Sequence, residues 1–230
     1  MSHNHNPIDA FKTICIEACK DRKACTKGYK DLLKANSAED IAVVWRKYWT
    51  ELVSEQYADR LLSELPAHYA DLSEGFNKAG VFFNECPVGL MQNSFVIIGN
   101  NTETIHIYGH AVAYVIGKAT VIAHDHSIIH SAQPDSVIEL LDHSTGHISA
   151  GTVTAYNHST LYTATDCTCF DSSQVHITKG TLHDHGHYLI KAYNTATIHT
   201  FTHIGIILYD RASIINNSLP LPHKPYYPKT

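Results

Sequence analysis

The feature that most constrains the fold is an eight-residue repeat that runs three times in succession through residues 107–130. Each octad begins with an apolar residue, has Gly or Asp at its third position and Ala or Ser at its fifth, and has Ala, Val or Ile at its seventh. The same skeleton returns in segments 140–144, 155–161, 182–188, 192–198 and 208–214. A repeat this short is typical of a β-solenoid, in which each coil stacks on the preceding one.

Alternate residues of a strand face opposite ways, so the odd and even positions of the octads predict two surfaces. The odd positions are small or apolar and fit a narrow interior: Ile107, Gly109, Ala111, Ala113, Val115, Gly117, Ala119 and Val121. The even positions are polar or aromatic and are predicted to face outward: His110, Tyr114, Lys118, Thr120, His124 and His126. Two octads per coil predict a flattened, two-sided solenoid, and a three-sided coil of longer period is the alternative.

Residues 7–80 have a helical period instead. We expect one helix over 7–34, a second that begins after a Ser37 cap, a third whose extension Pro66 limits, and a fourth over 67–78. At Val81 the apolar period changes from about 3.6 to 2. The predicted class is therefore α+β, with a helical N-terminal domain (1–80) that caps a right- or left-handed β-solenoid (81–217) of about seven coils. Residues 218–230 form a Pro-rich C-terminal tail.

Composition excludes several classes of function. The net charge of −5 with His neutral lacks the basic footprint of a protein that binds duplex nucleic acid. No apolar run reaches the roughly 18 residues of a membrane helix, and the first residues lack the pattern of a signal peptide, so we expect neither element. The six cysteines form no regular framework, so we expect free thiols and a cytoplasmic location.

The chain contains 18 histidines, which makes metal binding a hypothesis. Residues 183–187 read His-Asp-His-Gly-His, and alternate imidazoles of a strand project together. With two octads per coil, His183 stacks on His199, His187 on His203 and His110 on His126. The candidate ligands of a transition metal such as zinc are His183, His185, His187, His199 and His203. The interpretation we favour is that histidines fill outward positions without any cofactor, since ladders lack the closed tetrahedral geometry of zinc sites.

Three other residue types recur in positions that suggest chemistry. Cys167 and Cys169 lie on one side of a predicted strand, where buried core is the favoured interpretation over metal ligation. Asp recurs at the corner position, which indicates turn chemistry rather than the carboxylate pair of a glycosidase. Tyr precedes several corners and is expected to form a stabilising ladder. The predicted outward face comprises His110, His124, His126, Tyr156 and Tyr193.

Two of the octads resemble a known repeat type. Residues 192–199 (Ala-Tyr-Asn-Thr-Ala-Thr-Ile-His) and 155–162 (Ala-Tyr-Asn-His-Ser-Thr-Leu-Tyr) are similar to the Ala-Tyr-Asp-Asn-Ala-Thr-Val-x repeats of proteins from gut bacteria and their phages. The resemblance covers roughly residues 95–217. It implies a β-solenoid behind a short helical part, and it supplies no catalytic residue.

These observations lead to one expected function and two alternatives. We expect a non-enzymatic binding protein that uses the flat solenoid face to contact a protein partner or a small anionic ligand. A homo-oligomer is also compatible with this expectation. The resemblance implies a phage or mobile-element factor that counters a host system by binding a host protein or a nucleotide signal. The alternatives are a solenoid enzyme acting on a carbohydrate or nucleotide, and a histidine-rich metal-binding repeat protein.

Overall fold

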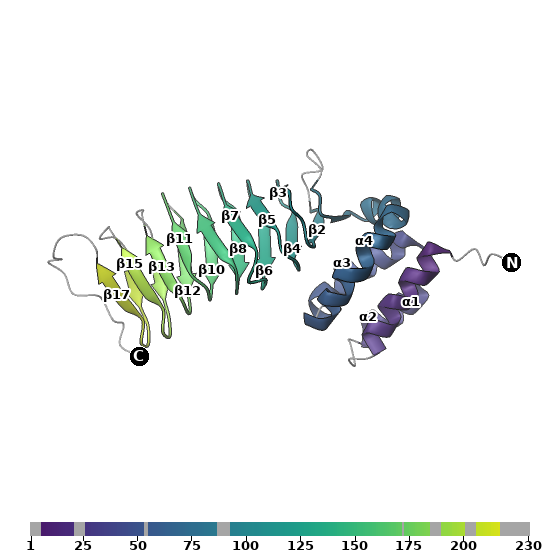
Figure 1. The fold of residues 1–230 in the computed structure, drawn as a ribbon, viewed down its shortest axis with the longest axis horizontal. Coiled ribbons are helices and arrows are strands. Elements are labelled where there is room, and N and C mark those ends of the chain that lie inside the picture. The colour runs from purple at the N-terminus through teal and green to yellow at the C-terminus, as the bar shows by residue number, and fades with distance from the viewer. Residues whose placement is uncertain are drawn as a thin grey trace. The chain divides into compact units, whose positions relative to one another are not determined.

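The structure is a computed structural model that describes residues 6–20, 26–52, 55–86, 93–171, 173–184, 190–200 and 206–216. It confirms the α+β class: four helices at the N-terminus are followed by parallel sheets that form a β-solenoid of about seven turns (Figure 1). The chain divides into two compact units, residues 1–83 and residues 84–230. The predicted tail, 218–230, lies outside the described residues.

The first unit is held together by a cluster of aromatic rings. Its helices are α1 (Pro7–Lys20), α2 (Thr26–Lys34), α3 (Ala38–Leu52) and α4 (Glu55–Lys78), and the short strand β1 (Val81–Phe83) follows them. Trp45 of α3 is fully buried between Phe11 of α1 and Phe76 of α4, with ring centroids 5.5 and 5.4 Å away. Each helix therefore buries the apolar stripe that its 3.6-residue period predicts.

The helix boundaries confirm one expectation and correct two. The amide of Asp40 donates to Ser37 Oγ at 3.0 Å, and the Asp40 carboxylate accepts from the Ser37 amide, so the predicted cap is present. The helix expected over 7–34 is divided into α1 and α2. The expectation that Pro66 limits a helix is wrong, because α4 continues through it. Leu65 and Leu72 are fully buried on either side of the proline, and this packing outweighs the one backbone hydrogen bond that proline cannot donate.

The second unit consists of short parallel strands in two sheets, as Figure 1 shows. Sheet A contains β2 (Phe95–Ile98), β4 (Val112–Val115), β6 (Ile128–Ser131), β8 (Thr145–Ile148), β10 (Thr160–Thr163), β12 (Gln174–Ile177), β14 (Ile190–Ala192) and β16 (Ile206–Leu208). Sheet B contains β3 (Thr104–Ile107), β5 (Thr120–Ala123), β7 (Val137–Leu140), β9 (Thr152–Ala155), β11 (Cys167–Cys169), β13 (Thr181–Asp184), β15 (Thr197–Thr200) and β17 (Ser213–Asn216). Each coil contributes one strand to each sheet, so the solenoid is two-sided rather than three-sided.

The interior follows the predicted alternation. All eight odd positions from Ile107 to Val121 are buried, whereas His110, Lys118 and His126 are exposed. Cys167 and Cys169 are both buried in the interior, which confirms their interpretation as core residues. The coil length is not fixed, since paired residues lie from 14 positions apart (Thr160 and Gln174) to 17 apart (Thr120 and Val137).

The corners explain the recurring Asp and Asn residues. Asp125, Asp142, Asn157, Asp171, Asn194 and Asp210 all have φ between 51° and 56°, the left-handed region that Asp and Asn tolerate. The carboxylate of Asp125 accepts from the Gly109 amide at 2.9 Å, and that of Asp142 accepts from the Asp125 amide at 3.2 Å. Each carboxylate thus binds the same corner of the preceding coil, which confirms turn chemistry at these positions.

Candidate functional site

The most continuous outward feature of the solenoid is a stack of five rings on sheet A. We call it the ring ladder, and its members are Tyr114, His130, His147, Tyr162 and His176. Successive ring centroids lie 4.7, 4.9, 4.9 and 4.6 Å apart, with interplanar angles from 5° to 25°. The strand register produces this column directly, because each ring occupies the same position of its strand and pairs with the ring of the next coil.

A cation continues the same column. Lys191 of β14 pairs with His176, so the ring ladder is followed by an ammonium group. None of the described strands of sheet A contains an Asp or Glu residue. The carboxylates of the corner residues Asp125 and Asp142 accept hydrogen bonds from backbone amides of the corners. The outward face of sheet A therefore has basic groups and no carboxylate of its own.

Burial tunes several ionisable groups of the ring ladder. Burial lowers the pKa of His130, and the neighbouring imidazole of His147 lowers it further. Burial also lowers the pKa of His176, and the positive charge of Lys191 acts in the same direction. Burial raises the pKa of the Tyr114 phenol. Near neutral pH these shifts favour uncharged rings, which can stack without repulsion and can accept or donate hydrogen bonds at their edges.

A second column lies beside the ring ladder on the same face. It consists of the residues two positions earlier in each strand: Val112, Ile128, Thr145, Thr160 and Gln174. The column is apolar at its β4 end and bears hydroxyl and amide groups from β8 to β12. We use the name ladder face for the ring ladder, Lys191 and this neighbouring column together.

The predicted outward residues form shorter stacks at the corners and on sheet B. His110 stacks on His126 at 5.2 Å as predicted, and the column continues through His143 and His158 at 5.2 and 5.3 Å. His183 stacks on His199 at 5.2 Å, also as predicted. Tyr156 stacks on Phe170 and Tyr193 on Tyr209, at 5.0 and 4.6 Å, which confirms that these tyrosines are rungs of structural ladders.

His124 has the closest imidazole partner of the predicted residues. Its Nε2 atom lies 3.0 Å from Nδ1 of His106, and its ring stacks on Tyr108 at 4.7 Å. The remaining predicted ligands, His185, His187 and His203, lie outside the described residues. Among the described side chains, no group of three or more His, Cys, Asp or Glu residues is arranged to hold a metal ion. The metal hypothesis for the predicted set therefore stays a prediction.

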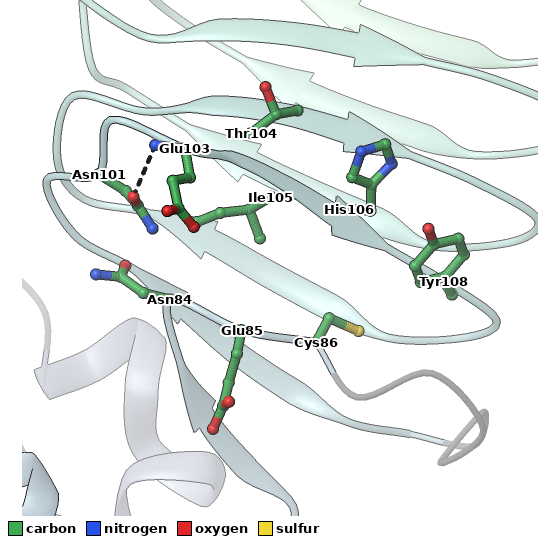
Figure 2. Close-up of a pocket in the computed structure, with 9 residues that line it drawn as sticks. All are labelled: Asn84, Glu85, Cys86, Asn101, Glu103, Thr104, Ile105, His106 and Tyr108. Carbon is green, nitrogen blue, oxygen red and sulfur yellow. Dashed lines mark hydrogen bonds between the residues drawn. The ribbon is translucent and has the colours of Figure 1, made fainter.

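A pocket of about 300 Å³ lies at the first coil of the solenoid (Figure 2). Its lining includes Glu85, Cys86, Glu103, His106 and Tyr108. Figure 2 shows the side chain of Glu85 directed away from that of Glu103, so the two carboxylates do not face each other across the pocket. Burial raises the pKa of the Cys86 thiol, although a hydrogen bond to the Tyr108 backbone opposes this shift. A protonated thiol and two divergent carboxylates do not form the acid–base pair of a glycosidase.

The ring ladder was not among the predicted features. Its members lie 16, 17, 15 and 14 residues apart, from Tyr114 to His130, His147, Tyr162 and His176. A search for aromatic residues and histidines at a variable spacing near two octads could have found it.

Comparison with known proteins assigns no function to this arrangement. No described helix is both long and apolar enough to cross a membrane. No protein-family model, no curated protein and no solved structure matches the chain.

Proposed function

We propose that this chain is a non-enzymatic binding protein whose binding surface is the ladder face. The observation that carries the proposal is the unbroken ring ladder from Tyr114 to His176, which continues into Lys191 on a sheet whose described strands contain no carboxylate. A flat surface with regularly spaced imidazole and phenol edges suits recognition, because its donors and acceptors are held in place by the sheet before a ligand arrives.

The charge of the ladder face favours an anionic ligand or an acidic segment of a protein. Lys191 supplies a fixed positive charge, and the three imidazoles of the ring ladder can gain protons when an anion approaches. The rings stack on one another, so their edges and not their faces are available to the ligand. Imidazole N–H and phenol O–H groups at these edges donate to carboxylate or phosphate oxygens.

The resemblance to repeats of gut bacteria and their phages suggests a biological setting for this binding. In that setting the protein would counter a host system by binding an acidic host protein or a nucleotide signal. The ladder face suits either ligand through the same chemistry, namely anionic oxygens that accept hydrogen bonds from ring edges.

The test is a titration of the isotopically labelled full chain with anions of several classes at about pH 6: nucleotides, an acidic peptide and an acidic polymer. We expect at least one of these anions to shift the ring resonances of His147 and Tyr162. His147→Glu, which places a carboxylate in the ring ladder, should abolish the shift of the Tyr162 ring resonances. The matched control Thr154→Glu places the same charge on sheet B and should leave binding intact. If no class of anion perturbs the ladder rings, the proposal is wrong.

Metal binding is the second candidate function, and one specific contact favours it. His106 Nδ1 and His124 Nε2 lie 3.0 Å apart, a separation at which two imidazole nitrogens can ligate a single ion after loss of the shared proton. The two rings are also stacked, with centroids 5.3 Å apart, so the close approach of Nδ1 and Nε2 is what distinguishes this contact.

A further inference from the structure

The repeat of the ladder face constrains the kind of anion that fits it. The ring centroids recur every 4.6 to 4.9 Å along the solenoid, which is the spacing of strands in a sheet. A compact ligand such as one nucleotide would contact two or three rungs and leave the others unused. A ligand that uses the whole column must be long, and its anionic groups must recur at this interval or at a small multiple of it.

We infer that the ligand of the ladder face is a linear polysaccharide that carries a carboxylate on each sugar, and that it lies along the ring ladder with one sugar per rung. This inference rests on the proposed function, since it names the ligand of the same surface. An extended chain of pyranose rings advances by about one ring length per sugar, which is close to the distance between neighbouring strands. Successive sugars are rotated about the chain axis, so the carboxylates of every second or third sugar face the ring ladder, while each sugar ring lies over one rung.

The composition of the ladder face favours a sugar polymer over a phosphate polymer. Phosphate chains are bound mainly by Arg and Lys, and Lys191 is the sole Lys or Arg in the described strands of sheet A. Single-stranded nucleic acids also require exposed ring faces on which bases can stack, whereas the faces of His147 and Tyr162 are covered by their neighbours.

The column beside the ring ladder supplies what the rest of a sugar ring requires. Val112 and Ile128 offer an apolar surface for the C–H face of a pyranose, and Thr145, Thr160 and Gln174 offer hydroxyl and amide groups for its hydroxyls. Carboxylates placed over the ring edges put the sugar rings over this second column. The ladder face thus has two parallel tracks, one for the charged groups and one for the sugar body.

The length of the column predicts the length of the ligand. Tyr114, His130, His147, Tyr162, His176 and Lys191 occupy successive strands from β4 to β14, which corresponds to about six rungs at the spacing of parallel strands. Affinity should therefore rise with the number of sugars up to about six and then level off, because further sugars extend beyond Lys191.

Protonation should strengthen the interaction. The groups next to His130 in the column are Tyr114 and His147, and those next to His176 are Tyr162 and Lys191. None of these neighbours is a carboxylate that would neutralise a protonated imidazole. Acidification therefore adds positive charge to the ladder face, and the described strands of sheet A supply no carboxylate to balance it.

The experiment is calorimetry of the full chain with oligogalacturonates of increasing length at about pH 5.5. We expect the affinity to rise at least about tenfold from the dimer to the hexamer and less than about twofold beyond it. At about pH 7.5 the hexamer should bind about tenfold more weakly. Lys191→Gln, which removes no stacked ring, should weaken binding several-fold, and Thr154→Gln on sheet B should not.

Three results would overturn the inference. A neutral cello-oligosaccharide that binds as tightly as the galacturonate hexamer would show that the carboxylates do not contribute to recognition. A polyphosphate or single-stranded DNA with the same affinity and length dependence would show that a sugar is not required. Absence of oligogalacturonate binding, while a nucleotide or acidic peptide still shifts the ladder rings, would leave the proposed function standing with another ligand. If no anion of any class binds, both this inference and the proposed function are wrong.

Discussion

The outward faces of sheets A and B differ although the same coils build both. On sheet A the central column has Ile97 and Ile207 at its ends, and between them lie an unbroken series of five rings and then Lys191. On sheet B the matching column is mixed, and its members in coil order are His106, Ile122, Glu139, Thr154, Thr168, His183, His199 and Ile215. The inward residues of the two sheets are alike, being Ala, Val, Leu, Ile or Cys on most strands.

This difference separates what the fold requires from what it leaves free. A two-sided solenoid needs small or apolar residues inside and residues at the corners that tolerate a left-handed backbone, and both sheets satisfy that need. Neither requirement demands a continuous ring column on one face. The ring ladder is therefore a property of sheet A beyond what coiling demands, and it is the region in which we place binding.

The prediction with the largest expected effect tests whether the inward faces of sheets A and B contribute equally to stability. Ile129 on β6 and Ile138 on β7 are both fully buried, one in each sheet. Replacement of either by Ala should lower the free energy of unfolding by about 2–5 kcal/mol, because it removes buried carbons and leaves a cavity. Urea denaturation followed by circular dichroism measures the loss. If one sheet tolerates its substitution and the other does not, the two interiors are not equivalent.

A smaller effect tests the difference between the outward faces. Tyr162 is 41% exposed, yet its ring stacks on both His147 and His176. Tyr162→Ala should cost about 1–3 kcal/mol, since each stacked pair contributes about 0.5–1.5 kcal/mol. Tyr162→Phe keeps both stacks and serves as the matched control, with little change in stability. Thr154→Ala on sheet B should change the unfolding free energy by less than about 0.5 kcal/mol. A cost for Thr154→Ala equal to that for Tyr162→Ala would contradict the special status of the ring ladder.

The interior and the corners could be predicted from sequence because both are local. The small residues at odd positions from Ile107 to Val121 define the inward face through the strand period alone. Asp and Asn residues that recur at the third position of octads define corners through their own backbone preference, as the φ of 55° at Asp142 illustrates. Neither inference needs the register between coils.

A fixed repeat of two octads does not predict the ring ladder, because the ladder depends on that register. A fixed interval of two octads pairs His130 with Gly146 and Tyr162 with Thr178, whereas the structure pairs them with His147 and His176. Corner length decides the register: residues 132–136 form a corner of five residues, and residues 149–151 form one of three. The same interval placed His183 against His199 correctly, because that coil happens to contain 16 residues.

A pH titration of stability sharpens the comparison further. Burial lowers the pKa of both His130 and His176, so in the range near and below about pH 6.5 the unfolded chain takes up these protons before the folded chain does. Stability should be complete above that pH and should fall as the pH drops toward the lower pKa values of the folded state. The double variant His130→Gln/His176→Gln should weaken this dependence. Thr145→Gln, a change on the same face without a titrating group, should leave the slope as it is. An unchanged slope in the double variant would assign the pH dependence to other groups.

The prediction with the smallest expected effect concerns metal binding. It asks whether an added metal ion binds at the ring ladder of sheet A or at the corner beside sheet B. The rings of His106 and His124 are stacked with centroids 5.3 Å apart, as the ladder rings are at 4.6 to 4.9 Å, but His106 Nδ1 and His124 Nε2 also lie 3.0 Å apart. Zinc or nickel added to the labelled full chain should therefore shift the ring resonances of His106 and His124 before those of His130 and His147. At a metal concentration equal to Kd the gain in stability is only about 0.4 kcal/mol, so spectroscopy is the better readout. His106→Gln should abolish these early shifts, and His147→Gln should not. Shifts that begin in the ring ladder, or that survive His106→Gln, would mean that metal is bound elsewhere and that the convergence of these two imidazoles is only a structural hydrogen bond.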